Sequence, residues 1–401
     1  MSDTPYFVKL EEAIEISCRT TIKPEIETVV LDESHGRILA LDLLSLVDDP
    51  AFDNSSMDGF AMRYEDTMNP PQTLDIIGTI QAAGQEDNVV VGPKQAVRIM
   101  TGAPIPEGAD SILQVELTTT NENKVTLQQE GMKHFIRKQG ENLLKGSVSI
   151  TAGTILTPSR IGLCATMGHS SLPVIKPLKV AIISTGDELI PPGEELQRGQ
   201  IYESNSFGLA GLVKWLGHEP IRMNNSGDSI DELRLALDKA ASTCDLILTS
   251  GGVSMGEWDL VRKIMEDEGD IHFWRVKIRP GSPPLFGIWG NTPIFGLPGN
   301  PVSSHVVFRT LVAPWIRNTT SAKGPIEVRT FARLATPVKP TKDSLTFRRV
   351  SIEMTNEGLV AHQKIHQGSG NIASIALSEG MVVLQPGQEY SIGDMVEVMI
   401  L

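Results

Sequence analysis

Three short runs of apolar residues, each closed by a Gly-rich turn, stand out in the second half of the chain. They are residues 180–183 before the turn at 184–189, residues 246–248 before the turn at 250–256, and residues 294–296 before the turn at 297–301. Continuous apolar runs of this length are typical of strands that are buried on both faces of a parallel sheet. Because open α/β sheets bind ligands at the edge where their parallel strands end, we expect the three turns to share one site.

Segments with helical spacing of apolar residues separate these runs. Helices are predicted at residues 206–216, 230–241, 257–267 and 301–315, and strands at 179–183, 246–249 and 293–295. Alternation of this kind predicts a doubly wound, three-layer α/β domain, which we place at residues 178–326.

The flanking segments follow other patterns. Between residues 46 and 146, short β-type runs broken by Pro and Gly predict a β-rich lobe, and strand-length segments over residues 327–401 predict a small C-terminal β-barrel. Residues 1–45 and 147–177 are assigned together to a linker domain of helix and β-structure. Its first helix is expected to start at Thr4 and Pro5, with Phe7 and Leu10 on the apolar face.

Composition narrows the class of partner. The chain has 401 residues, with 35 Lys and Arg against 49 Asp and Glu and a formal net charge of -14. This balance argues against nucleic acid, and it means that an anionic ligand needs cations or a metal ion placed locally. The 3 cysteines lie far apart, a pattern that favours neither a disulfide framework nor a zinc site. A signal-peptide pattern and long apolar runs are both absent, so we predict a cytoplasmic protein without a membrane span.

Two consecutive glycines mark the second turn. Ser250, Gly251, Gly252 and Ser254 place small residues where the backbone can approach a ligand closely. Backbone N–H groups in such a turn, backed by the N-terminus of a helix, attract phosphate or another oxyanion. A tight strand-to-helix turn without a ligand is the alternative interpretation.

Acidic residues accompany the first two turns. Asp187 and Glu188 follow the first strand, and Asp259 lies in the first turn of the helix after the second. Carboxylates at this edge suit a divalent cation, so the sequence predicts phosphate and metal chemistry. Helix capping is the alternative for Asp187 and for Asp228, and a favourable interaction with the helix dipole is the alternative for Asp259.

Two basic residues and two prolines are further candidate site residues. Lys277 and Arg279 stand beside the turn at Pro280, an arrangement that suits an oxyanion, although a solvated edge strand has the same pattern. Pro298 and Pro301 fix the shape of the third turn and begin a helix, which is also a sufficient structural role.

Taken in order, the motifs resemble those of the molybdopterin molybdenumtransferase (MoeA) family, which is also represented by the E domain of gephyrin. The resemblance rests on residues 54–61, 100–106, 140–142, 184–189, 201–205, 250–259, 279–281, 297–303 and 367–369. These motifs span nearly the whole chain. Where the family often has Lys-Pro-Gly-Lys-Pro, this chain has Arg279 and Ser282 in place of the two lysines, and an arginine still suits a tetrahedral oxyanion.

The resemblance implies an enzyme of molybdenum cofactor biosynthesis. Such a transferase inserts molybdate-derived metal into adenylylated molybdopterin and releases AMP with the help of Mg²⁺. The resemblance also implies a homodimer, in which the site lies between the α/β domain of one subunit and the β-rich lobe of the other. Molybdopterin adenylyltransferase is the expected substrate donor.

The resemblance assigns roles to individual positions. The candidate catalytic residues are Asp58, Thr101, Glu188, Asp228 and Asp259, and the candidate metal ligands are Glu188 and Asp259. The candidate substrate-binding residues are Asp187, Ser250, Gly251, Gly252, Ser254, Lys277, Arg279, Pro298, Pro301, Arg349 and Ser369. Among these, Arg279, Arg349 and Ser369 match the region that holds molybdate in similar proteins.

Three functions stay open at this point: a molybdenum-inserting enzyme, a tungsten-inserting or inactive molybdopterin-binding paralogue, and a scaffold protein. Tungstate and molybdate have nearly the same size and charge, so the residues do not separate them. Glu188, Asp259 and Arg279 together favour catalysis, because a scaffold has no need of them.

Overall fold

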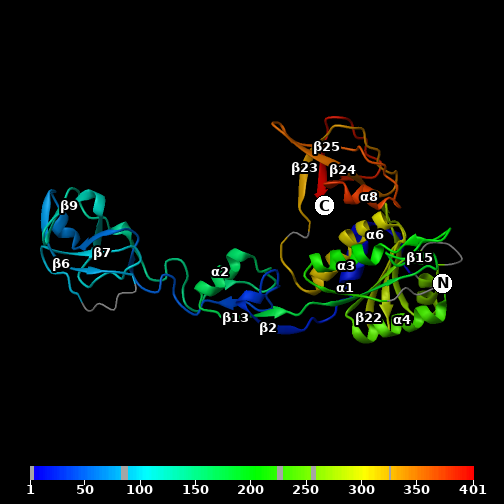
Figure 1. The fold of residues 1–401 in the computed structure, drawn as a ribbon, viewed down its shortest axis with the longest axis horizontal. Helices are drawn as coiled ribbons and strands as arrows, with labels where there is room; N and C mark the ends of the chain where they lie inside the picture. Colours follow the sequence, from blue (N-terminus) through cyan, green and yellow to red (C-terminus); the bar gives the residue numbers. More distant parts are fainter. Residues whose placement is uncertain (1–3, 83–88, 224–228, 254–258, 325–326) are drawn as a thin grey trace.

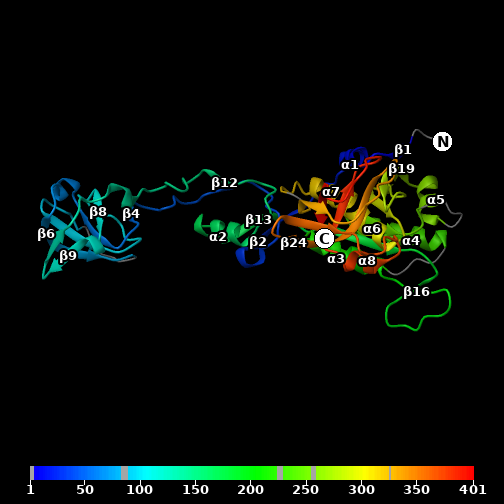
Figure 2. The same cartoon turned by 90° about the horizontal axis from the view of Figure 1, so that it is seen from above.

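The computed structural model describes residues 4–82, 89–223, 229–253, 259–324 and 327–401. The molecule is elongated, with the β-rich lobe at one end, the linker domain in the middle, and the α/β domain with the C-terminal barrel at the other end (Figures 1 and 2). Within the described ranges, no helix has both the length and the apolar character needed to cross a membrane.

A seven-stranded mixed sheet forms the centre of the α/β domain. Its order is β1 (Tyr6–Val8), β19 (Asp270–Val276), β21 (Leu285–Trp289), β22 (Thr292–Leu297), β18 (Leu246–Ser250), β14 (Lys179–Ser184) and β17 (Glu219–Arg222). Strands β22, β18 and β14 are parallel neighbours, as the sequence predicted, and β21 runs antiparallel to β19 and β22. The hydropathy pattern missed β19 because Asp270, His272 and Arg275 interrupt its apolar residues.

Helices cover both faces of this sheet (Figure 1). One layer contains α1 (Leu10–Arg19), α3 (Asn205–Trp215), α6 (Pro301–Val307) and α7 (Ala313–Thr319), with a π-helical turn, η5 (Phe308–Val312), between the last two; the other contains α4 (Ile230–Thr243) and α5 (Leu260–Asp267). Val180 and Ile182 of β14 pack into the first apolar core, and Ala181 and Ile183 pack into the second. Burial on both faces explains the continuous apolar run and confirms the three-layer prediction.

The N-terminal segment differs from the prediction. Residues 6–8 form β1, which pairs in parallel with β19, and α1 begins at Leu10 rather than at Thr4 and Pro5. Aromatic and β-branched side chains favour an extended segment. The Trp274 N–H of β19 donates to the Pro5 carbonyl (3.1 Å), and the N–H of Lys277, the residue after β19, donates to the Val8 carbonyl (2.8 Å). Residues 6–19 therefore lie on the α/β sheet and not in the linker domain to which residues 1–45 were assigned.

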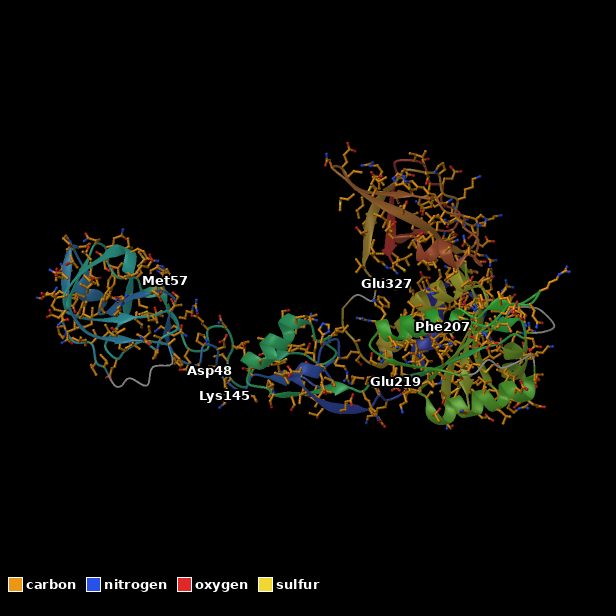
Figure 3. The ribbon with its side chains drawn as sticks, viewed as in Figure 1. Asp48, Met57, Lys145, Phe207, Glu219 and Glu327 are labelled. Atoms are coloured by element: carbon orange, nitrogen blue, oxygen red, sulfur yellow. The ribbon has the colours of Figure 1, made fainter. Side chains whose placement is uncertain are left out.

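The linker domain joins the lobe through two chain segments. Its elements are β2 (Ile26–Val30), which pairs with β13 (Ser171–Ile175), β3 (Leu43–Leu44), which pairs with β12 (Val148–Ile150), and α2 (Pro158–Thr166). Beyond it, the carboxylate of Asp48 accepts hydrogen bonds from the Lys145 backbone N–H (2.7 Å) and from the Gln139 side chain (2.8 Å), which lower the pKa of Asp48. These contacts hold the two segments together (Figure 3).

The β-rich lobe and the C-terminal domain each contain a six-stranded or barrel-like sheet of their own. The lobe contains a sheet of β8 (Ser111–Gln114), β5 (Gly59–Met62), β7 (Gln95–Ile99), β6 (Gln72–Ile80), β10 (Lys124–Leu127) and β9 (Thr118–Asn121), and a pair of β4 (Asn54–Ser55) with β11 (Ile136–Arg137). The C-terminal domain contains β24 (Leu345–Thr355), β25 (Gly358–His362), β23 (Arg329–Leu334), β27 (Met395–Ile400) and β26 (Gly380–Leu384), with α8 (Ile372–Ala376). Strand β24 pairs with both β25 and β26, so the ring closes and confirms the predicted barrel.

Candidate functional site

Three strands of the α/β sheet end at the same level. Ser184 of β14 is paired with Ser250 of β18, and Ser250 is paired with Leu297 of β22. The ladder continues one step into the turns, since the Thr185 N–H donates to the Ser250 carbonyl (3.1 Å) and the Gly251 N–H donates to the Leu297 carbonyl (3.0 Å). The three turns therefore leave the sheet side by side, as the sequence predicted.

A cleft of about 500 Å³ opens over these turns. The predicted site residues that line it are Glu188, Ser250, Gly251, Gly252, Asp259 and Pro298. The exposed Asp187 is on the first of the same turns. Ser254 and Asp228 lie outside the described residues.

The second turn requires glycine at positions 251 and 252. Gly251 and Gly252 have positive φ angles of 102° and 67°, which side-chain-bearing residues rarely adopt. A Cβ atom at Gly251 would lie 2.8 Å from the Thr185 hydroxyl, and one at Gly252 would lie 3.0 Å from a methyl group of Val261. The two glycines therefore let the turn pack closely on the first turn and on α5.

Asn205 braces the second and third turns against each other. It is the first residue of α3, and its side-chain amide donates to the Ser250 hydroxyl (2.7 Å) and to the Gly299 carbonyl (2.7 Å). Asn205 belongs to the motif at residues 201–205 that contributes to the family resemblance, but no role was predicted for it. That motif was the only signal in the sequence, because the bracing contacts exist only after β18 and β22 have paired.

Glu188 directly precedes a short pair of strands, which we call the rim of the cleft. Strands β15 (Leu189–Ile190) and β16 (Ile201–Tyr202) pair in parallel, and the loop between them projects from the domain (Figure 2). The Ile201 N–H donates to the Glu188 carbonyl (2.9 Å), which fixes the backbone of this residue at the mouth of the cleft.

The donor set of the cleft fits a magnesium ion only in part. In the described ranges, no group of three or more His, Cys, Asp or Glu residues is arranged to hold a metal. The carboxylates of Glu188 and Asp259 nevertheless line one cleft, and proteins commonly hold Mg²⁺ through one or two carboxylates together with substrate phosphates. These residues therefore fit Mg²⁺ if the substrate supplies the remaining oxygens.

The third turn is tied to the barrel. The Ser304 hydroxyl donates to the Pro298 carbonyl, and α6 starts at Pro301. The Val302 N–H donates to the carbonyl of Ser369, which comes from the C-terminal domain (3.1 Å). A loop of the barrel thus touches the start of α6 just behind the cleft.

Arg349 is buried beneath that loop. It has no exposed surface, and its guanidinium donates to the Gly368 carbonyl (3.2 Å) and to the Ser374 hydroxyl (3.2 Å). Burial, and secondly the positive charge of Arg348, lowers the pKa of Arg349 to about 10. Arg349 therefore supports the loop that carries Ser369, while one terminal nitrogen of its guanidinium is buried without a hydrogen-bond partner among the described residues.

Lys277 and Arg279 lie outside the lining of the cleft. The Lys277 ammonium is 5.5 Å from the centre of the Phe7 ring, and Lys277 lines a different pocket together with Lys9 and Lys342. Arg279 is exposed on β20 (Ile278–Arg279), which pairs with β24 of the barrel. Both cations therefore sit at the junction between the α/β domain and the barrel.

Asp58 and Thr101 form a pair in the distant lobe. One carboxylate oxygen of Asp58 accepts hydrogen bonds from the Thr101 N–H (2.7 Å) and hydroxyl (2.8 Å), and these bonds lower the pKa of Asp58. Figure 3 shows the neighbouring Met57 at the opposite end of the molecule from Phe207 of the α/β domain. A single chain does not bring this pair to the cleft.

The fold and the cleft define a multidomain α/β protein with a cleft at the edge of its central sheet. The chain matches three family models in succession: the MoeA N-terminal region (domain I and II) over residues 8–168, a probable molybdopterin binding domain over residues 181–318, and the MoeA C-terminal region (domain IV) over residues 332–401. The chain therefore belongs to the molybdopterin molybdenumtransferase (MoeA) family, whose members are transferases of molybdenum cofactor biosynthesis.

Relatives of similar length agree with this assignment. The molybdopterin molybdenumtransferase of Haemophilus influenzae is 38% identical over 363 residues, which cover 90% of this chain and 89% of the relative, and that of Bacillus subtilis is 33% identical over 405 residues, which cover 98% and 94%. A solved molybdopterin biosynthesis MoeA protein from Pyrococcus horikosii superimposes with a TM-score of 0.83 at 32% identity and covers 98% of this chain and 99% of its own. The predicted family, fold class and transferase activity are confirmed, and the paralogue and scaffold alternatives are not favoured.

Gly251→Ala is expected to destabilise the protein by about 1–3 kcal/mol, because the new methyl group would approach the Thr185 hydroxyl while the backbone keeps a strained φ. Urea unfolding measures the loss. Gly299→Ala is the matched control in the same cleft, since a Cβ atom there makes only an ordinary contact of 3.6 Å with the Gly251 Cα. Equal stability of the two variants would show that the second turn tolerates side chains.

Proposed function

We propose that this protein transfers molybdenum from molybdate to adenylylated molybdopterin and releases AMP. The observation that carries the proposal is the cleft in which the Gly251-Gly252 turn and the carboxylates of Glu188 and Asp259 meet over three strand ends. The relatives, which are 31% to 38% identical, are named molybdopterin molybdenumtransferases, which supports the transfer of molybdenum to molybdopterin.

The chain's own groups bind and orient the nucleotide part of the substrate. The Gly252 backbone N–H, backed by the N-terminus of α5, orients the phosphates, whereas the Gly251 N–H already donates to the Leu297 carbonyl. Asn205 keeps the second and third turns at a fixed separation, so the donors are in place before the substrate binds. Glu188 and Asp259 would hold Mg²⁺, which neutralises phosphate charge when it is bound. This local arrangement offsets the net charge of -14, which opposes an anionic substrate.

The second substrate, molybdate, binds at the junction between the α/β domain and the barrel. Arg279 is exposed there, and its guanidinium suits a tetrahedral oxyanion. Ser369 lies beside the start of α6, and buried Arg349 supports the loop that carries it. We assign molybdate contacts to Arg279 and Ser369, with Lys277 as an additional cation nearby. Asp187 of the first turn, together with Asp228 and Ser254, stays a candidate substrate-positioning residue.

A second copy of the chain completes the site. The Asp58–Thr101 pair lies in the lobe, far from the cleft of its own chain (Figure 3). Phe207 and Trp215 lie on one face of α3 with 47% and 49% of their surface exposed, which suits a partner surface. We propose a homodimer in which each lobe brings its Asp58–Thr101 pair to the cleft of the partner subunit. Molybdopterin adenylyltransferase is the proposed substrate donor, in the cytoplasm.

Asp259→Asn is expected to lower the rate of AMP release by roughly 10²–10³-fold, because a charge that positions the cation and the phosphate is lost. Binding of adenylylated molybdopterin should weaken much less, since the Gly251-Gly252 turn is intact. AMP and metal-loaded pterin are measured with molybdate and Mg²⁺ present. Asp267→Asn, an exposed carboxylate at the far end of α5, is the control. Turnover at the wild-type rate in the Asp259 variant would refute the assigned role.

Hybrid dimers test the shared site. Homodimers of the Asp58→Asn chain and of the Asp259→Asn chain are each expected to lose most of their activity, whereas a dimer of one chain of each kind has one intact site. Such a hybrid should therefore release AMP at about half the wild-type rate per dimer. Purification through two different tags isolates the hybrid. A hybrid as inactive as its parents would contradict the assembly of the site from two chains.

A further inference from the structure

A buried carboxylate lies directly behind the cleft. Glu203 is 8% exposed and occupies the turn between β16 and α3. One of its carboxylate oxygens accepts hydrogen bonds from the Ser184 hydroxyl (3.0 Å) and the Ser206 N–H (2.8 Å), and the other accepts one from the Ser206 hydroxyl (2.6 Å). A single side chain thus joins the end of β14 to the first turn of α3.

Arg222 of β17 completes the network. Its guanidinium lies 3.7 Å from the Glu203 carboxylate, donates a hydrogen bond to the Ser206 hydroxyl (2.7 Å), and stacks on the Phe207 ring with 3.4 Å to the ring centre. A buried carboxylate is costly unless it is paired and hydrogen-bonded. Because Glu203 has three donors and a cation, its position and orientation are strongly specified.

The network is connected to two groups of the cleft, Glu188 and Asn205. The Glu203 N–H donates to the Ile190 carbonyl (2.9 Å), and the adjacent strand β16 holds the Glu188 carbonyl through the Ile201 N–H (2.9 Å). Two residues after Glu203, the Asn205 amide spans the second and third turns. Glu203 therefore lies between the β15–β16 pair, which positions Glu188, and Asn205, whose side chain connects the second and third turns.

We propose that Glu203 is a positioning residue for the transfer reaction, which acts by fixing Glu188 and Asn205. The inference rests on the proposed function and adds a residue to its machinery. Glu203 does not line the cleft, so it acts only through its neighbours. Apolar packing alone would hold α3 on the sheet, whereas directed hydrogen bonds fix the rotation of its first turn and hence the direction of the Asn205 side chain.

Glu203→Gln preserves the volume of the side chain and removes its charge. We expect kcat for AMP release to fall about tenfold while KM for adenylylated molybdopterin changes less than about threefold, because the Gly251-Gly252 turn is untouched. Glu219→Gln, an exposed carboxylate on the same strand as Arg222, is the matched control and should leave both constants unchanged.

A double variant separates positioning from independent effects. Asn205→Ala is expected to lower kcat by a similar factor. The kcat of the double variant, Glu203→Gln with Asn205→Ala, should be no more than about twofold below that of the less active single variant. Losses that multiply to about 100-fold would mean that the two side chains act independently, and would overturn the proposal.

Hydrogen exchange without substrate supplies a readout that does not depend on activity. In the Glu203→Gln protein, the amides of Ile201, Glu203 and Ser206 should exchange at least tenfold faster, while the strand amides of β14 and β18 keep their wild-type protection. Unchanged exchange at the rim, or a loss of protection across the whole sheet, would overturn the proposal. If wild-type protein releases no AMP, the proposed function fails, and the local exchange pattern still decides whether Glu203 organises the rim.

Discussion

Parallel pairing in register of β14, β18 and β22 is the constraint on which the rest of the structure depends. It places Ser184, Ser250 and Leu297 at one level, so the three turns that follow enter the same cleft. Apolar cores on both faces hold the strands, and a one-residue slip in any of them would turn its side chains to the opposite core. The position of every cleft group therefore follows from strand register.

Under the proposed function, the same pairing accounts for the binding of a phosphate group by an acidic protein. With a net charge of -14, the average field of the molecule repels an anion, so attraction must come from groups fixed at short range. Backbone N–H groups carry no titratable charge and are held by the sheet, and Gly251 and Gly252 keep side chains away from them. The Glu203 network has a related role, because it fixes the first turn of α3 and the rim beside the cleft.

The sequence predicted structure best where the apolar pattern of a single segment was enough to indicate its burial. The runs before Ser184, Ser250 and Leu297 predicted buried parallel strands because both faces of each strand are apolar. Strand β1 was missed because three residues form a strand only by pairing with β19, more than two hundred positions away. The burial of Arg349 and the contacts of Asn205 and Glu203 arise from residues distant in the chain, so local patterns did not indicate them. Family resemblance named Asp58 and implied a site shared between two subunits, whereas the hydrogen bonds from Thr101 to Asp58 became visible only in the folded chain.

The most direct test of the account is a crystal structure of the protein with adenylylated molybdopterin bound. The adenylyl phosphate is expected to lie within about 3 Å of backbone N–H groups in the Gly251-Gly252 turn, between Asn205 and Asp259. A nucleotide bound elsewhere, for example in the pocket lined by Lys9, Lys277 and Lys342, would contradict it.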